Sequence, residues 1–180
     1  FQKALAGDNY YQDFFFLRDE PTDWLSKFGG SAWAPFGDTG KYYLHLYDVT
    51  QADLNWHNPH VREELFKVVH FWLDKGVKGF RFDVINVIGK DEILENCPEN
   101  DGKPAYTDRP IVHEYLHMLN EETFGTDETI MTVGEMSATN IENCILYTAP
   151  ERHELSMAFN FHHLKVDYEN GQKWTLKNFD

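Results

Sequence analysis

Cysteines, basic residues and long apolar runs are all scarce in this sequence of 180 residues. Cys97 and Cys144 lack the spacing of a metal site, so we interpret both as unpaired thiols of a reducing compartment. No apolar run approaches the length of a membrane-spanning helix. The 30 acidic residues outnumber the 16 basic ones, and the net charge of −14 argues against nucleic acids and anionic membranes as partners. We therefore expect a cytoplasmic protein whose partner is a small molecule.

The sequence also lacks an initiator methionine and a signal-like start. It opens at Phe1 in the middle of a pattern, and it ends at Asp180 in what looks like the beginning of a helix. We therefore expect a fragment of a longer protein. With 42% hydrophobic residues, a chain of this length can still bury a core of ordinary domain size.

Residues 1–55 show no sustained helical period. They are rich in aromatic residues, Gly, Asp and Thr, which favours short strands joined by turns. The segment KYYLHLYDVT, residues 41–50, is the clearest strand among them. This composition predicts an irregular excursion that differs from the rest of the chain.

A regular alternation of helices and strands begins at Asn58. Asn58 is a good N-cap, Pro59 suits the first helical position, and Gly76 ends the pattern. The apolar face of this helix is predicted to hold Val61, Leu65, Val68, Val69 and Trp72. A second helix is predicted to start at Pro110, with Ile111, Tyr115, Leu116 and Leu119 facing inward. A shorter helix is predicted over residues 140–147, and strands over 77–84, 129–136 and 155–161. This alternation is typical of an α/β fold with a parallel sheet.

Two of the predicted strands end in a carboxylate. The run VKGFRFDV ends with Asp83 beside Arg81, and the run TIMTVGEM ends with Glu135. An arginine and an aspartate at a strand end are often a purely structural ion pair. A second acid at the end of the neighbouring strand favours a functional interpretation, because active sites of parallel α/β barrels lie at this end. Two carboxylates on adjacent strands are what glycoside hydrolysis requires.

The segments GFRFDV, VGEM and QADLNWHNPHVR resemble conserved stretches of the α-amylase superfamily, in particular its bacterial α-glucosidase branch. The resemblance extends along the whole chain. It implies a partial TIM (β/α)8 barrel, in which residues 1–55 end a subdomain inserted after the third strand. Residues 56–180 would then form part of the catalytic barrel, including about its fourth to sixth strands. The third acidic residue of the family has no counterpart in this sequence.

The resemblance also implies roles for individual residues. It places Asp83 as the nucleophile, Arg81 as the arginine that holds it, and Glu135 as the general acid/base. These roles suit the sequence, because Asp83 has a cation beside it and should stay ionised. Glu135 has no cation adjacent in sequence and has apolar neighbours, which favour a protonated acid.

Further residues match substrate-binding positions of the family. Phe28, Tyr47 and Gln51 correspond to positions that line the glucose subsite, although core packing or a solvated turn would also explain them. Val84 is the residue usual after the nucleophile in the branch that cleaves bonds other than α-1,4. His162, Lys165 and Lys173 lie in or near the segment FNFHHLKVDY, where their charges suit a phosphate group. Ordinary surface lysines remain the alternative.

The resemblance therefore predicts the hydrolysis of trehalose 6-phosphate to glucose and glucose 6-phosphate. One alternative is the cleavage of α-1,6 bonds in isomalto-oligosaccharides, as by oligo-1,6-glucosidases and dextran glucosidases. Another is a non-catalytic amylase-like module, against which the presence of both acids argues. We expect no cofactor and no metal. His113 and His117 have helical spacing, but no third ligand follows them.

Overall fold

The computed structural model of the chain describes residues 1–161, 168–169 and 172–173. Its helices are α1 (Gln2–Leu5), α2 (Asn9–Gln12), α3 (Pro59–Asp74), α4 (Ile111–Leu119) and α5 (Ile141–Thr148). Its strands are β1 (Leu17–Arg18), β2 (Trp33–Pro35), β3 (Tyr42–Leu44), β4 (Gly79–Phe82), β5 (Met131–Glu135), β6 (Met157–Phe159), β7 (Tyr168–Glu169) and β8 (Gln172–Lys173). They form an antiparallel sheet β1-β3-β2, a parallel sheet β4-β5-β6 and an antiparallel pair β7-β8.

The ends of α3 lie where the sequence predicts them. The Asn58 side chain accepts a hydrogen bond of 2.9 Å from the backbone N–H of His60, and Pro59 occupies the first turn. Beyond the other end, Gly76 adopts a φ of 84°, a left-handed conformation that glycine reaches without a steric penalty. The residues predicted to bound the helix thus lie at its two ends.

The buried face of α3 is narrower than its apolar face. Val61 and Val69 are buried, but Val68 and Trp72 are 54% and 49% exposed. The described residues thus cover only part of the predicted apolar face and leave these two side chains exposed. Periodicity identifies an apolar face but does not tell how much of it the described neighbours cover.

Helix α4 packs its apolar face into the main core. Val112, Tyr115, Leu116 and Leu119 are buried, whereas the predicted Ile111 is only half-buried. This core also contains Val69 of α3, Tyr147 of α5 and residues from the loops around the parallel sheet. The burial of so many large apolar side chains stabilises the arrangement of the three helices on the sheet.

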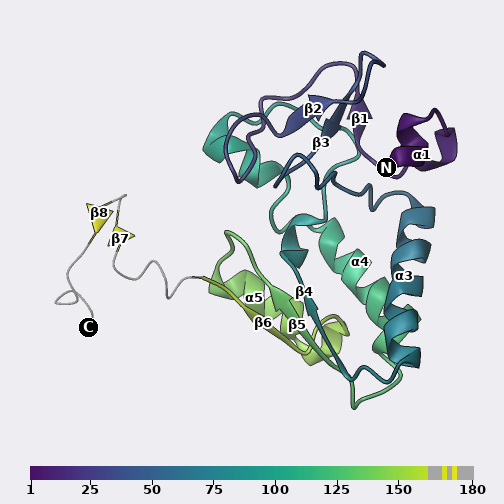
Figure 1. Ribbon diagram of the computed structural model, residues 1–180. Helices are drawn as coiled ribbons and strands as arrows, with labels where there is room; N and C mark the ends of the chain where they lie inside the picture. Colours follow the sequence, from purple (N-terminus) through teal and green to yellow (C-terminus); the bar gives the residue numbers. More distant parts are fainter. Residues whose placement is uncertain (162–167, 170–171, 174–180) are drawn as a thin grey trace.

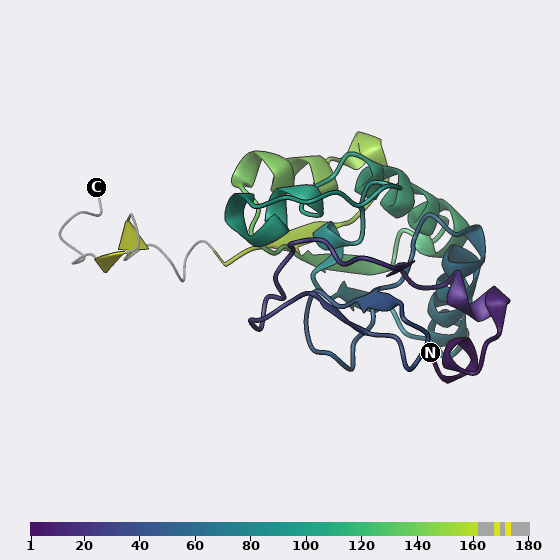
Figure 2. The ribbon, with the colours of Figure 1, turned by 90° about the horizontal axis from the view of Figure 1, so that it is seen from above.

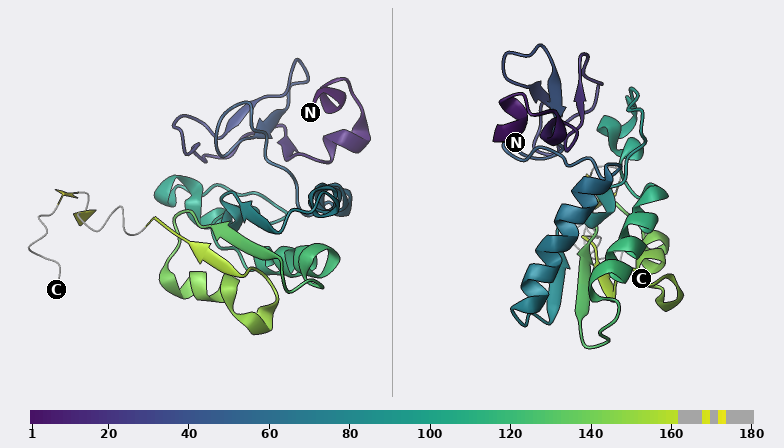
Figure 3. Two further views of the ribbon diagram at one scale, coloured as in Figure 1. Left: turned by 60° about the horizontal axis from the view of Figure 1, so that its bottom comes forward. Right: turned by 90° about the vertical axis from the view of Figure 1, so that its right-hand side faces the viewer.

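The parallel sheet follows the predicted strand–helix–strand order. Its β4–β5 ladder runs from Gly79 opposite Met131 to Phe82 opposite Gly134, and β6 pairs with the other edge of β5. Side chains alternate between the two faces of a strand. Phe80 and Phe82 accordingly pack against the core on the helix side, which puts the neighbouring odd-numbered positions on the opposite face. Figures 1 and 3 show α4 and α5 on one side of the three strands.

Residues 1–55, called the first region below, contain α1, α2 and the small antiparallel sheet. The predicted strand at residues 41–50 contains β3, which is shorter than expected, and two short helices appear where only strands and turns were predicted. This region lies above the carboxyl ends of β4 and β5 in Figure 1, and Figure 2 shows the same arrangement from above.

A second core joins this region to the loop after β4. It contains Trp24 and Leu44 from the first region and Val87 and Tyr106 from the loop. The boundary near residue 55 stays a prediction, because the two sides share this core.

A buried ion pair connects the same two regions. The Lys90 ammonium is 2.9 Å from Asp53 Oδ1 and also donates to the Val87 carbonyl at 2.9 Å. The side chain of Lys90 is 1% exposed, and that of Asp53 is 15% exposed. Asp53 Oδ2 in turn accepts a hydrogen bond from the backbone N–H of Leu46. A buried charge is costly unless it is paired and hydrogen-bonded, and both conditions are met here.

Two further predictions concern absent features. In the part of the chain that the structure describes, no helix combines the length and apolarity needed to cross a membrane. Cys97 and Cys144 both carry free thiols, as predicted.

Candidate active site

Asp83 and Glu135 lie side by side just past the end of a strand ladder. The last register pair of β4 and β5 is Phe82 with Gly134, so Asp83 and Glu135 occupy the next position on each strand. By the alternation of the pleat, both share with Arg81 the face of the sheet opposite to Phe82. The site residues are thus brought together by the parallel register itself.

The guanidinium of Arg81 contacts both carboxylates. Its Nη1 lies 2.5 Å from Asp83 Oδ1, and its Nη2 forms an ion pair with Glu135 Oε2. The pair with Asp83 was predicted from the sequence, but the pair with Glu135 was not. Glu135 has no cation adjacent in sequence, but the strand register brings Arg81 beside it in space.

The environments of the two carboxylates differ. The Glu135 side chain is 12% exposed, whereas that of Asp83 is 69% exposed and that of Arg81 is 49% exposed. Asp83 is therefore open to an approaching molecule. Glu135 is covered, and its neighbour Met136 is fully buried.

Val84 turns the backbone sharply after Asp83. Its φ of 38° and ψ of 43° lie in the left-handed region, which is costly for a β-branched residue. This conformation ends β4 and starts the 3₁₀ turn η1 (Ile85–Val87). Strained residues of this kind persist only where the surrounding structure holds them, and they cluster at functional sites. Val84 also packs against the second core through its partly buried side chain.

Tyr47 and Phe28 lie together, and Tyr47 is close enough to Asp83 to be affected by its charge. Their rings meet edge to face with centroids 5.7 Å apart, and Phe28 is 71% exposed. Burial raises the pKa of the Tyr47 hydroxyl, and the negative charge of Asp83 adds to this rise. Tyr47 is therefore within electrostatic range of Asp83, and the exposed Phe28 ring offers a flat apolar surface beside it.

Gln51 lies in an exposed turn of the first region. Its Oε1 accepts a hydrogen bond from the backbone N–H of Asp48 within a solvent-exposed turn. It lines a hollow of about 660 Å³ together with Phe1 and Tyr43, and neither Asp83 nor Glu135 lines that hollow. The structure thus matches the solvated-turn alternative considered for this residue.

The predicted phosphate-binding residues fall at the edge of the described chain. His162 and Lys165 lie outside the described residues. Lys173 belongs to β8, where its backbone pairs with Tyr168, and its side chain is not described. Their roles stay predictions.

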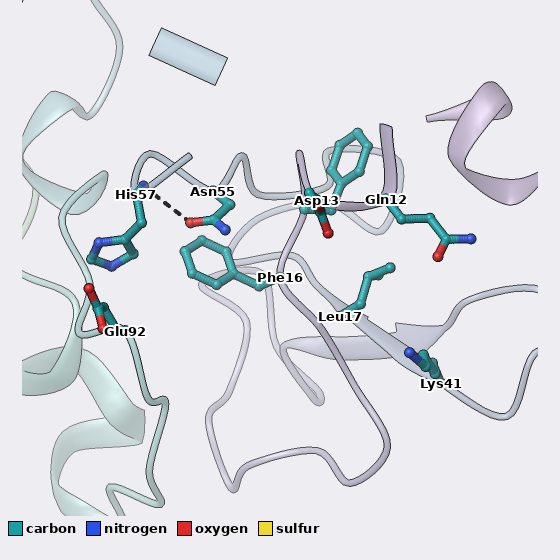
Figure 4. Close-up of a pocket in the computed structure, with 9 residues that line it drawn as sticks. Gln12, Asp13, Phe16, Leu17, Lys41, Asn55, His57 and Glu92 are labelled. Carbon is teal, nitrogen blue, oxygen red and sulfur yellow. Dashed lines mark hydrogen bonds between the residues drawn. The ribbon is translucent and has the colours of Figure 1, made fainter. Parts of the chain in front are cut away.

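A separate hollow of about 400 Å³ lies between the first region and the loop after β4. Figure 4 shows side chains around it, including His57, Asn55 and Glu92. The backbone N–H of His57 donates to Asn55 Oδ1 at 3.2 Å. Neither Asp83 nor Glu135 lines this hollow, so it is distinct from the candidate active site.

The sequence did not predict a polar network that joins the segments following the two carboxylates. The network joins Asn86, which follows Asp83, to Ser137, which follows Glu135, and to Asp108. Lys27 reaches the same place and donates to Ser137 Oγ at 2.8 Å. One signal was available, because Asn86 is a lone polar residue in the apolar run VINVI.

Together, the parallel β/α units and the acid pair at the carboxyl ends of their strands define a barrel-type α/β protein with a glycosidase-like site. Comparisons with known proteins give the family. The model for the catalytic domain of α-amylases matches residues 1–180. The chain belongs to this family and holds part of a (β/α)8 barrel, which confirms the predicted fold class and family.

Individual relatives are close in sequence and in structure. The chain is 52% identical to trehalose-6-phosphate hydrolase of Bacillus subtilis and 51% identical to that of Escherichia coli, in both cases covering 100% of this chain and 33% of the relative. It is 45% identical to oligo-1,6-glucosidase of Parageobacillus thermoglucosidasius, covering 98% of this chain and 33% of the relative. The crystal structure of Bacillus licheniformis trehalose-6-phosphate hydrolase matches with a TM-score of 0.91 and 54% identity, over 100% of this chain and 34% of that one. The chain thus spans about a third of the length of these relatives.

Proposed function

We propose that this chain is the nucleophile- and acid-bearing part of a retaining glycoside hydrolase that cleaves trehalose 6-phosphate into glucose and glucose 6-phosphate. The observation that supports the proposal most strongly is the contact of one guanidinium, that of Arg81, with the carboxylates of both Asp83 and Glu135. A purely structural ion pair needs only one acid.

The separation of the strands favours the retaining mechanism. Neighbouring strands lie about 4.8 Å apart, and Asp83 and Glu135 occupy adjacent positions on neighbouring strands. Retaining enzymes need their carboxyl groups about 5–5.5 Å apart, whereas inverting enzymes need roughly 6.5–9.5 Å to admit a water molecule. The register therefore suits direct attack on the sugar better than attack by a water held between the acids.

In the first step, the exposed Asp83 carboxylate attacks the anomeric carbon, and the bond to the glycosidic oxygen breaks. Glu135 gives its proton to that oxygen, which leaves as a hydroxyl group. In the second step, Glu135 takes a proton from water, and the resulting oxygen nucleophile releases the sugar from Asp83. Arg81 orients Asp83 and fixes its position relative to Glu135.

The assignment of the substrate depends on the relatives. The two trehalose-6-phosphate hydrolases are 52% and 51% identical to the chain, whereas the oligo-1,6-glucosidase is 45% identical. We infer that Tyr47 and Phe28 contribute to the glucose subsite, since their rings are in contact and the charge of Asp83 affects Tyr47. Val84 would border the same subsite, because it directly follows Asp83 in the sequence.

The remaining inferences concern partners and cellular location. We propose a sugar phosphate as the partner and the cytoplasm as the location, supported by the net charge of −14 and the two free thiols. Among the described residues no cluster of three or more His, Cys, Asp or Glu side chains is arranged to hold a metal ion.

The phosphate preference predicts a selective loss in lysine variants of the full-length enzyme. Lys165→Ala and Lys173→Ala are each expected to raise KM for trehalose 6-phosphate by about ten- to a hundredfold, because a charge-assisted contact contributes roughly 1.5–3 kcal/mol. A phosphate carries nearly two negative charges at neutral pH, and the acidic background of this chain repels it. Hydrolysis of an unphosphorylated glucoside should change little. The measurement is kcat/KM for both substrates at low and high salt, since added salt weakens such contacts.

Lys67→Ala provides a matched control for that experiment. Lys67 is an exposed lysine on α3 that pairs with Glu64 and lies far along the sequence from the predicted phosphate site. It should leave both substrates unaffected. Equal losses on both substrates in the two test variants would show that Lys165 and Lys173 are structural. A wild-type preference for isomaltose over trehalose 6-phosphate would favour the α-1,6-glucosidase alternative.

A further inference from the structure

We propose that Asn86 and Asp108 are positioning residues that fix the loop after Glu135 against the segment after Asp83. They would thereby set the relative position of the two carboxylates. This inference rests on the proposed function. It concerns residues that follow the two acids in the chain or bond to such residues.

Asn86 joins the segment after β4 to the loop after β5, beyond the last backbone pair of the two strands. Its Nδ2 donates to the Ser137 carbonyl at 2.8 Å, and the Ser137 backbone N–H donates to Asn86 Oδ1 at 2.8 Å. The side-chain amide thus imitates a backbone pair between the two chain segments. Asn86 is fully buried and lies three residues after Asp83, while Ser137 lies two residues after Glu135. These two hydrogen bonds, called the Asn86–Ser137 clamp below, therefore lie within a few residues of both acids.

Asp108 collects hydrogen bonds from both segments. Asn86 Nδ2 donates to its Oδ1 at 2.9 Å, and Thr139 Oγ1 donates to its Oδ2 at 2.6 Å. Asn143 Nδ2 and the Tyr147 hydroxyl complete the set, each donating at 2.8 Å. A carboxylate has about four acceptor positions, so these donors saturate it. One carboxylate thus binds the turn after β4, the loop after β5 and helix α5 together.

Three of the six described non-glycine residues with a positive φ lie in or next to this network. Val84, Asp108 and Ala138 have φ values of 38°, 51° and 52° without being glycine. Each such conformation is unfavourable and is retained only where neighbouring contacts over-determine it. The backbone N–H of Asp108 also donates to the Asn86 carbonyl at 3.0 Å, which holds Asp108 in its unusual conformation. Val84 directly follows Asp83, and Ala138 lies three residues after Glu135, so these two strained positions lie on the segments that the network joins.

Lys27 attaches the first region of the chain to the same point. Its ammonium donates to Ser137 Oγ and lies over the rings of Tyr47 and Tyr106, 5.8 Å and 5.4 Å from their centroids. Ser137 is therefore held from two directions, by Asn86 through its backbone and by Lys27 through its side chain. Ser137 lies two residues after Glu135 on the same chain segment, so loosening this residue would act first on the position of Glu135.

The test compares two substrates in the full-length enzyme. Trehalose 6-phosphate needs proton donation from Glu135, whereas p-nitrophenyl α-glucoside has a leaving group that needs none. Asn86→Ala is expected to lower the rate of glycosidic bond cleavage about 10- to 100-fold on trehalose 6-phosphate, because a displacement of about 1 Å can cost 10²-fold. On the activated glucoside, the first-turnover rate should fall less than about threefold. Thr139→Val removes one donor to Asp108 at a half-buried position and should give a smaller loss with the same selectivity.

Thr132→Val is the matched control. Thr132 is 1% exposed on β5, and its hydroxyl bonds to Ser156 on the loop before β6, away from the clamp. This variant should reduce thermal stability yet keep the wild-type ratio of the two rates, measured well below its melting temperature. A ratio unchanged in Thr139→Val and in folded Asn86→Ala would overturn the positioning role. Wild-type enzyme without activity on trehalose 6-phosphate would instead contradict the proposed substrate, and the same ratio would then be measured with isomaltose.

Discussion

Replacement of Asp83 by asparagine is expected to lower kcat of the full-length enzyme by roughly 10⁴-fold, which corresponds to several kcal/mol of lost transition-state stabilisation. The amide has nearly the shape of the carboxylate but is a far weaker nucleophile, so no glycosyl ester can form. The Asp83 side chain is 69% exposed, and Arg81 keeps its second partner Glu135 in the variant. The fold should therefore persist, with a circular dichroism spectrum and a melting temperature close to those of the wild type.

Asp127→Asn is a suitable control for this variant. Asp127 is another exposed aspartate paired with a basic residue, Lys78, but it precedes β5 and so lies at the amino end of the strands. Its substitution should leave kcat unchanged. Near-wild-type turnover in Asp83→Asn would remove Asp83 from the mechanism, whatever the control shows.

Glu135→Gln should produce a loss that depends on the leaving group. On trehalose 6-phosphate, kcat/KM is expected to fall by about 10²–10⁴-fold, the usual contribution of a general acid. On p-nitrophenyl α-glucoside, the first step needs no proton, while the second still needs the base that the variant lacks. Rapid mixing should therefore show a burst of nitrophenolate, about one per enzyme molecule, followed by slow turnover.

Added azide distinguishes this explanation from a general loss of structure. Azide attacks the glycosyl ester without a base, so it should restore turnover in Glu135→Gln and yield a glycosyl azide. Equal losses on both substrates, together with no response to azide, would contradict the acid/base role of Glu135.

The features that local patterns determine could be read from the sequence. Asn58 and Gly76 bound α3 as predicted, because capping depends on residues next to the helix ends. The runs ending in Asp83 and Glu135 form parallel strands, because β-branched and aromatic residues bounded by turn signals favour strands. The predicted proximity of the two acids followed from the topology alone and is confirmed by their adjacent register positions.

Contacts between distant segments could not be read in this way. The pair of Arg81 with Glu135 depends on the register between two strands, and the Asn86–Ser137 clamp depends on the course of two loops. Nothing in local periodicity encodes either of them. The pair of Lys90 with Asp53 has the same character, because its partners come from two regions that meet only after folding. The exposure of Val68 and Trp72 likewise depends on which surfaces the described neighbours cover.

The stereochemistry of the first-formed product tests the central claim most directly. Time-resolved proton NMR of the full-length enzyme with an α-glucoside reports the anomer of glucose released before mutarotation. If Asp83 attacks the sugar and Glu135 then activates water on the face that the leaving group vacated, two successive inversions occur and α-glucose appears first. Initial release of β-glucose would mean that a single displacement by water takes place, and it would contradict the assignment of Asp83 as nucleophile.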